Sequence, residues 1–204
     1  MLKVGLTGNI GSGKTFAAEI FQSLGIPVFF ADKEAGNLYS HEKVKNQVRE
    51  LFGDVVFEKQ GIISRSRLAE IVFNDQKLLE KLNHIIHPVV LQEYNLWLEK
   101  YTNTPYSLYE AAILFESGHY KDMDRIICVT APEEVRINRV VNRNGISPEE
   151  VRIRMAHQWD ESRKANLADF VIINDGIIEV RRQVEKIHQQ IMIISDNPRL
   201  KTNN

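Results

Sequence analysis

Residues 8–15 combine glycines, a lysine and a threonine in the spacing of a phosphate-binding loop: glycine, four residues, then Gly-Lys-Thr. The glycines let backbone amides approach phosphate oxygens closely, the lysine supplies a mobile positive charge, and the threonine hydroxyl suits Mg²⁺. The pattern therefore predicts a nucleoside triphosphate site. We expect every residue of the loop to take part: Gly8, Asn9, Ile10, Gly11, Ser12, Gly13, Lys14 and Thr15.

The segments on both sides of the loop have the character that such a loop requires. Residues 2–7 are mostly apolar and predict a buried strand, whereas residues 16–21 predict a helix. The N-terminus of that helix would add about half a positive charge and unpaired amide donors. Strand, glycine loop and helix in this order distinguish a phosphate-binding loop from a glycine-rich turn.

Short apolar runs recur along the chain and alternate with helical patterns. This alternation predicts an α/β fold with a parallel five-stranded sheet, in which ligands bind beyond the carboxyl ends of the strands. The long, mostly helical interval between the second and third runs predicts a helical insertion, and the apolar spacing from Val180 to Ile191 predicts a last helix. The predicted strands are residues 2–7, 26–30, 107–112, 125–130 and 169–173.

Two acids stand near the ends of predicted strands. Asp32 is the first acid after the second strand, where a carboxylate could accept the proton of an attacking hydroxyl or hold Mg²⁺ through water. It could equally cap a helix, and the sequence favours neither role. Glu116 follows the apolar run 111–115 and is the acid nearest a strand end that could serve Mg²⁺, although Glu110 interrupts the same run.

Arg136, Arg139 and Arg143 follow helical spacing after Pro132 and would share one helix face. Because like charges on one face repel each other, we expect a polyphosphate to compensate them. The alternative is a solvated face that is paired with acids from elsewhere, such as Glu133, Glu134 or Glu149.

Gly145 predicts the end of that helix, and Ser147-Pro148 predicts the start of another. Two helices around a glycine are typical of a mobile lid.

His84 and His87 lie three residues apart on a predicted helix. No third metal ligand follows at a recognised spacing, so we favour a hydrogen-bonding or packing role near the substrate.

Composition excludes several classes of protein. The net charge of −1 gives no field toward nucleic acid, and no apolar run approaches the length of a membrane span. One cysteine, Cys128, cannot form an internal disulfide, and the loop at residue 8 leaves no room for a signal peptide. We expect a cytoplasmic protein without nucleic acid or membrane partners, as a monomer or weak homo-oligomer.

Among proteins with phosphate-binding loops, a small-molecule kinase competes with a nucleotide switch or motor. A GTPase switch needs Asp-x-x-Gly and Asn-Lys-x-Asp, and neither pattern occurs in this sequence. Motors usually carry an aliphatic run that ends in an aspartate, which is also missing. A kinase needs an acceptor pocket, a basic lid and a base, for which the insertion, the arginines and Asp32 are candidates.

The order and spacing of several segments resemble the dephospho-coenzyme A kinase family over nearly the whole chain, to about residue 194. No segment after the loop is specific alone, and a generic nucleoside or nucleotide kinase is the nearest alternative. The segments are 5–15, Ala31-Asp32, 82–88, 114–118, 139–143 with Gly145, Arg154 with Gln158, Ala168-Asp169 and 174–176.

The resemblance implies a three-layer α/β/α P-loop kinase that uses ATP and Mg²⁺ to phosphorylate the ribose 3′-hydroxyl of dephospho-CoA, the last step of coenzyme A synthesis. It implies that Asp32 is the base or an orienting carboxylate and that Arg139 and Arg143 belong to a lid over the phosphates. Glu116 and His87 would lie on the substrate side, with Asn174 and Gly176 near the adenine of ATP.

By the same resemblance, the chain is one kinase domain with a core of residues 1–31, 105–135 and 165–195, an acceptor-binding insertion of 32–104 and a lid of 136–164. The sequence departs from the family pattern at several positions: Phe16, Phe30, Ala112, Arg136 and Asn144.

Overall fold

A computed structural model describes residues 1–197, apart from the side chain of Phe73. It divides the chain into two units: the first contains Met1–Phe30 and the chain from Leu98 onward, and the second contains Ala31–Trp97. Each unit buries apolar side chains of its own.

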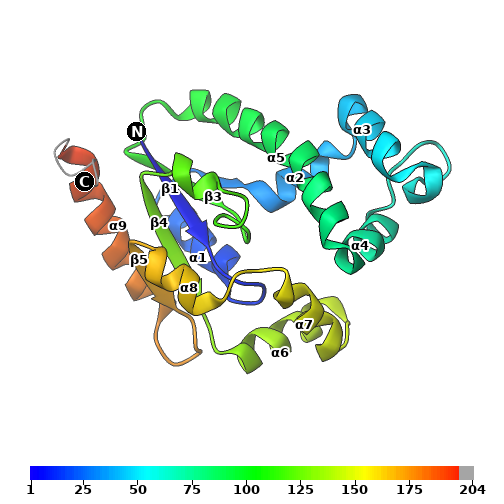
Figure 1. Ribbon diagram of the computed structural model, residues 1–204. Helices are drawn as coiled ribbons and strands as arrows, with labels where there is room; N and C mark the ends of the chain where they lie inside the picture. The colour runs from blue at the N-terminus through cyan, green and yellow to red at the C-terminus, as the bar shows by residue number, and fades with distance from the viewer. Residues whose placement is uncertain (198–204) are drawn as a thin grey trace. The chain divides into compact units, whose positions relative to one another are not determined.

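A parallel five-stranded sheet forms the centre of the first unit, with the strand order β2-β3-β1-β4-β5 (Figure 1). All five strands predicted from apolar runs are confirmed. The third strand ends two residues earlier than predicted, so that Glu110 is its last residue. The strands are β1 Leu2–Thr7, β2 Val28–Phe30, β3 Tyr106–Glu110, β4 Arg125–Thr130 and β5 Phe170–Ile173.

Helices cover both faces of this sheet and give the unit three layers (Figure 1). The helices α1 (Lys14–Ser23) and α9 (Val180–Asp196) share a hydrophobic core with Ile127 and Val129 of β4. Because side chains alternate along a strand, Cys128 faces the opposite side, where α8 (Glu161–Leu167) packs on β4. Burial there raises the pKa of the Cys128 thiol to about 12, with the Glu161 carboxylate adding to the effect.

Two consecutive helices, α6 (Glu133–Asn144) and α7 (Pro148–Ala156), follow β4. The predicted break is confirmed, because Gly145 adopts the left-handed conformation (φ 65°) that ends α6. Ser147 begins α7 through a capping box, in which Ser147 and Glu150 each accept a hydrogen bond from the other's backbone amide. Apolar residues of both helices pack into a small core that Ile10 of the phosphate-binding loop joins.

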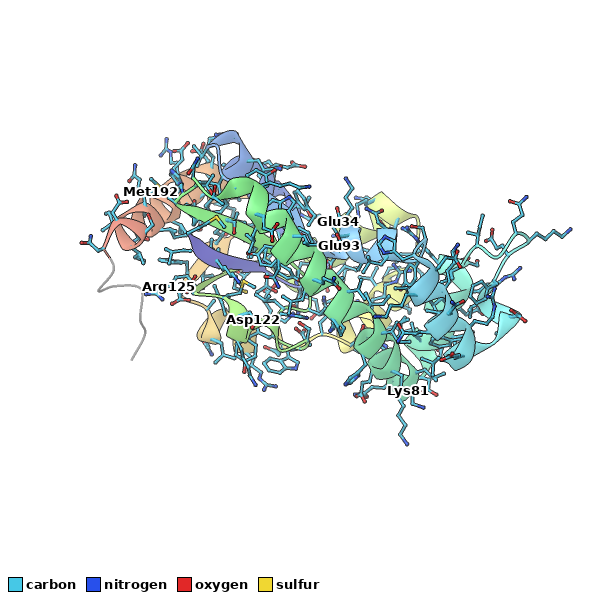
Figure 2. The ribbon with its side chains drawn as sticks, turned by 90° about the horizontal axis from the view of Figure 1, so that it is seen from above. Glu34, Lys81, Glu93, Asp122, Arg125 and Met192 are labelled. Atoms are coloured by element: carbon cyan, nitrogen blue, oxygen red, sulfur yellow. The ribbon has the colours of Figure 1, made fainter. Side chains whose placement is uncertain are left out.

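The second unit is helical, as the long interval between the strands predicts. Its longest helix, α5, continues through Pro88 and reaches Leu98, just past the unit boundary. Lys81 extends away from this helix (Figure 2). The helices are α2 Ala31–Leu38, α3 Glu42–Phe52, α4 Arg65–Asn74 and α5 Gln76–Leu98, with short 3-10 turns at Asp54–Val56 and, in the first unit, at Glu99–Tyr101 and His119–Asp122. Within residues 1–197, no helix is both long and apolar enough to cross a membrane.

The amino ends of β4 and β5 are joined by Asp169. Its Oδ2 accepts a hydrogen bond from the Ile126 amide at 2.7 Å, and its Oδ1 lies 3.6 Å from Nε of Arg125, which is labelled in Figure 2. This edge of the sheet is opposite to the carboxyl edge where the phosphate-binding loop begins. Asp169 therefore holds two strands together and has no direct part in the chemistry at the loop.

A partly buried hydrogen bond makes the stability of the first unit depend on pH. The Tyr106 hydroxyl lies 2.7 Å from Nδ1 of His188, and desolvation lowers the His188 pKa below its ordinary value. The folded state therefore binds the proton less tightly than the unfolded chain does. The stabilisation is complete above the unfolded pKa of about 6.5 and is lost as the pH falls through the lower folded pKa.

We expect the free energy of unfolding to fall less steeply between about pH 7 and 5 in His188→Gln than in the wild type. Urea unfolding across this pH range measures the slope. Gln189→Ala, at an exposed neighbour on the same helix, is the matched control and should keep the wild-type slope. Identical slopes in wild type and His188→Gln would contradict the assignment.

Candidate active site

The loop between β1 and α1 presents an open helix N-terminus. Gly13 is the N-cap residue of α1 in a left-handed conformation (φ 91°, ψ 23°), no side chain caps the helix, and no acid stands in its first turn. The free amides and the helix dipole therefore favour an anion at this end. A Cβ atom at Gly11 would collide with the backbone of Arg136, and one at Gly13 with the side-chain amide of Asn174. Both glycines are thus required by close approach as well as by backbone conformation.

Polar contacts from distant parts of the chain hold the loop in place. The Ile10 amide donates to Oε1 of Gln158 at 2.9 Å, and the Asn9 side chain donates to the carbonyl of Trp159 at 3.0 Å. The Asn174 side chain donates to the carbonyl of Ser12 at 2.8 Å. These contacts fix the loop before any ligand binds, which reduces the entropy cost of ordering it.

One buried hydroxyl in the loop fits a phosphate ligand. Ser12 is 0% exposed, and its Oγ has no hydrogen-bond partner within residues 1–197. A buried donor without a partner costs free energy, and a phosphate oxygen would satisfy it. The loop therefore fits the triphosphate that its sequence predicts.

Lys14 contacts Glu110, an acid that is not among the predicted site residues. Its Nζ lies 3.5 Å from Oε1 of Glu110, which is 3% exposed at the end of β3. Strand register places Glu110 beside Leu6 of β1, just before the loop. The sequence does mark Glu110, because it is the first acid in this apolar strand pattern. The predicted strand, residues 107–112, continues two residues past it.

Glu116 does not stand at a strand end, and that part of the prediction is wrong. It lies in the turns beyond β3, where Oε1 is 2.7 Å from Nζ of Lys164 and accepts a hydrogen bond from the Trp159 amide at 2.8 Å. Lys164 is 0% exposed and also donates to the carbonyl of Ala112 at 2.8 Å. Desolvation lowers the Lys164 pKa, and the Glu116 carboxylate opposes this by favouring the charged form.

Trp159 connects this buried ion pair to the loop, through its amide to Glu116 and through its carbonyl to Asn9. Its ring stacks on Phe115 with centroids 6.0 Å apart, and the guanidinium of Arg163 lies 3.5 Å from the ring centroid. No local sequence pattern marks this role of Trp159, because both contacts join distant parts of the chain.

Arg139 joins three of the predicted site segments. Its Nη1 donates to the carbonyls of Gly11 and Ser12, each at 3.4 Å, and its Nη2 donates to the carbonyl and Oδ1 of Asn174, each at 3.1 Å. The structure therefore brings Arg139, the loop and Asn174 together. Gly176, also predicted, is exposed two residues beyond Asn174.

The loop that carries Gly176 is shaped by Asp175, whose carboxylate accepts hydrogen bonds from the amides of Ile177 and Ile178 at 2.8 and 2.9 Å. These bonds lower the Asp175 pKa.

The other two arginines of α6 have separate surroundings, so the prediction of one shared phosphate-facing surface is wrong for Arg136. That side chain is buried, donates from Nε to the carbonyl of Ala131 at 3.0 Å, and lies 3.3 Å from Oε1 of Glu161. Its acid partner thus comes from α8. Arg143 is exposed, and its Nε donates to Oδ1 of Asn144 at 2.9 Å.

Two predicted site residues belong to the second unit. Asp32 is exposed in the first turn of α2, which begins at Ala31, so the helix-capping interpretation is wrong. His87 is half-buried in α5, and His84 on the same helix has Nδ1 2.7 Å from the carbonyl of Glu80. Across the described residues, no group of three or more His, Cys, Asp or Glu side chains is placed to hold a metal ion.

Comparison with known proteins gives one consistent family. The family model described as dephospho-CoA kinase matches residues 2–180. A dephospho-CoA kinase of Aquifex aeolicus is 37% identical over 193 residues, which covers 94% of this chain and 98% of the relative. One of Neisseria meningitidis is 36% identical over 188 residues, with 91% and 90% covered.

Solved structures agree with these matches. A protein of Thermus thermophilus superposes with a TM-score of 0.82 at 33% identity, covering 93% of this chain and 96% of the other. The dephospho-CoA kinase of Campylobacter jejuni gives a TM-score of 0.66 at 28% identity, with 94% and 97% covered.

Proposed function

Because this chain belongs to the dephospho-CoA kinase family, we propose that the residues gathered around its phosphate-binding loop carry the reaction of that family. The enzyme transfers the γ-phosphate of ATP to the ribose 3′-hydroxyl of dephospho-CoA, which yields coenzyme A and ADP in the last step of coenzyme A biosynthesis. The single observation that carries the residue assignment is the open amide end of α1 with Lys14 beside it.

On the ATP side, the loop of residues 8–15 binds the phosphates with the backbone amides at the N-terminus of α1, and Lys14 moves from Glu110 to the β- and γ-phosphate oxygens. Arg139 stabilises the charge that develops on the transferred group, since it already lies against the loop carbonyls. Asn174 and Gly176 line the adenine side, next to the loop contact that Asn174 makes with Ser12.

Mg²⁺ fits the oxygen donors at this edge of the sheet. The Thr15 hydroxyl is exposed in the first turn of α1, and the Glu110 carboxylate stands at the end of the neighbouring strand. When bound, the ion neutralises charge on the phosphate oxygens. Glu110 also holds Lys14 before ATP arrives.

On the acceptor side, we assign Asp32 as the carboxylate that accepts the proton from the attacking 3′-hydroxyl or orients it. His87 and the insertion of residues 32–104 bind the acceptor. Glu116 positions Trp159 by accepting a hydrogen bond from its amide. The buried Oε2 of Glu116 has no hydrogen-bond partner in the described part of the chain and is therefore the atom that can accept a hydrogen bond from the substrate. The lid comprises residues 136–164, and the core comprises 1–31, 105–135 and 165–195.

We further propose a cytoplasmic enzyme that acts on small molecules without nucleic acid or membrane partners, as a monomer or weak homo-oligomer.

A substrate panel tests the assignment of the acceptor. The purified protein is incubated with ATP, Mg²⁺ and, in turn, dephospho-CoA, nucleosides and nucleoside monophosphates. We expect a phosphorylated product from dephospho-CoA at far higher kcat/KM than from the others. A nucleoside or nucleotide preferred over dephospho-CoA would favour the generic kinase instead.

Arg143→Ala tests the lid assignment. The side chain is exposed, so its loss should change the free energy of unfolding by less than about 0.5 kcal/mol. We expect kcat to fall about tenfold or more, because a cation that reaches the phosphates only in the closed lid would be lost. Steady-state kinetics and thermal unfolding measure the two effects.

The matched control for this prediction is Arg152→Ala, at an exposed lid arginine paired with Glu149 on α7. It should retain the wild-type kcat. Equal kcat values for Arg143→Ala and the wild type would mean that Arg143 lies on a solvated helix face and has no role in phosphoryl transfer.

A further inference from the structure

The second unit contains a cavity of about 470 Å³ of its own. Its walls come from the end of α2, from α3, from the segment before α4 and from the start of α4. This volume lies within the range of small-molecule sites, about 300–1,000 Å³. All of its lining residues belong to the second unit.

The charged residues that line the cavity are both cations. Lys45 and Arg65 face it, and no acid lines it. Lys45 also pairs with Glu42 at 2.9 Å, but that carboxylate is 79% exposed and lies outside the lining. Within residues 1–197, no carboxylate forms an ion pair with Arg65. An anion in the cavity would therefore meet two positive charges, of which only Lys45 is paired with a carboxylate of the protein.

Arg65 is fixed in position by the residues around it. Its Nη2 donates to the carbonyl of Gly36, and its guanidinium lies 5.9 Å from the ring centroid of Tyr39. A Cβ atom at Gly36 would come within 2.9 Å of Nη1 of Arg65. Gly36 thus leaves room for the guanidinium, whose remaining donors can form the paired hydrogen bonds that phosphates accept.

The rest of the lining is mixed. Tyr39, Ile62 and Ile63 supply apolar surface, and Asn37 and Ser40 supply hydrogen-bonding groups. Burial raises the Tyr39 pKa, so its hydroxyl stays protonated and able to donate. Such a lining suits a ligand that combines a phosphate group with an apolar chain carrying amides.

The cavity lies along the same helix as Asp32. Gly36 follows Asp32 by one helical turn, so both residues share a face of α2 and are separated by about 6 Å along its axis. In dephospho-CoA, the 3′-hydroxyl and the 5′-diphosphate are attached to the same ribose, a few bonds apart. A ribose held at Asp32 would therefore direct its diphosphate along α2 toward Gly36 and Arg65.

We propose that this cavity binds the 5′-diphosphate of dephospho-CoA, with Arg65 and Lys45 as the phosphate ligands, and the start of the amide-containing chain beyond it. The proposal rests on the proposed function, because it takes dephospho-CoA as the acceptor and Asp32 as its ribose contact. On this proposal, Arg65 and Lys45 are the residues that make the enzyme prefer dephospho-CoA to a plain nucleoside as acceptor.

The experiment compares dephospho-CoA with adenosine, which offers the ribose 3′-hydroxyl but no diphosphate. For Arg65→Gln and Lys45→Gln, we expect the KM for dephospho-CoA to rise about tenfold or more, while the KM for ATP stays near the wild-type value. The ratio of kcat/KM for dephospho-CoA to that for adenosine should fall by the same factor. Lys43→Gln, at an exposed lysine of α3 outside the cavity, is the matched control.

A second variant tests the position of Arg65 without removing its charge. Gly36→Ala suits the middle of a helix but displaces the guanidinium, so it should also raise the KM for dephospho-CoA and leave that for ATP unchanged. If the wild type phosphorylates dephospho-CoA but all three variants keep its KM, this inference is overturned and the proposed function stands. If the wild type does not phosphorylate dephospho-CoA, the proposed function fails and the inference with it.

Discussion

Lys14→Ala is expected to reduce kcat/KM for phosphoryl transfer by about 10³-fold or more. Phosphoryl transfer depends on positioning and charge stabilisation, and Lys14 is the cation that α1 carries at the phosphate-binding loop. The loss should appear with every acceptor, because Lys14 acts on ATP. Steady-state assays with saturating dephospho-CoA measure it, and wild-type turnover in this variant would refute the loop assignment.

The same substitution should also affect stability. Lys14 is paired at 3.5 Å with Glu110, whose side chain is 4% exposed, and removal of the lysine leaves a buried carboxylate with less compensation. Loss of one partner of a buried pair costs about 3–5 kcal/mol in comparable cases, so the free energy of unfolding should fall by up to about 3 kcal/mol.

The double variant Lys14→Ala/Glu110→Gln separates these two effects. Neutralising Glu110 should restore most of the stability and none of the activity, because the cation at the phosphates is still absent. Urea unfolding and the kinase assay on the same preparations provide the comparison. Recovery of activity in the double variant would mean that Lys14 serves only to neutralise Glu110.

Asp32→Asn is expected to lower kcat by about 10²- to 10⁴-fold while it changes the KM for ATP by no more than about twofold. Asparagine keeps the size of the side chain but cannot accept the proton of the attacking hydroxyl, and general base catalysis is worth about this much. Because Asp32 is exposed in the first turn of α2, the fold should tolerate the change.

Glu34→Gln is the matched control for this prediction, since Glu34 is the other acid in the first turn of α2. Its kcat should stay within about twofold of the wild-type value, as it lies outside the proposed machinery. An effect of Asp32→Asn confined to the KM for ATP would assign the carboxylate to Mg²⁺ rather than to the acceptor hydroxyl.

Much of the fold followed from local patterns in the sequence. Apolar runs predicted all five strands. The strands β1 to β4 are largely buried and form nearly continuous apolar segments, and the edge strand β5 is also apolar although Val171 and Ile173 are exposed. The break at Gly145 and the restart at Ser147 were equally visible, since cap residues act on their own backbone. The strand β3 ends at Glu110, two residues before the predicted end, so the acid at the end of this strand is Glu110 and not Glu116.

The sequence by itself determined the chemistry of the loop and the class of reaction, because the glycine spacing, the lysine and the helix N-terminus are all contiguous in the chain. Only the tertiary structure decided which side chains hold that loop. Ile10 and Gln158 are 148 residues apart, and Lys14 meets Glu110 only through the pairing of β1 with β3. Such contacts leave no periodicity to detect, since they arise when separate elements pack and each buried polar group finds a partner.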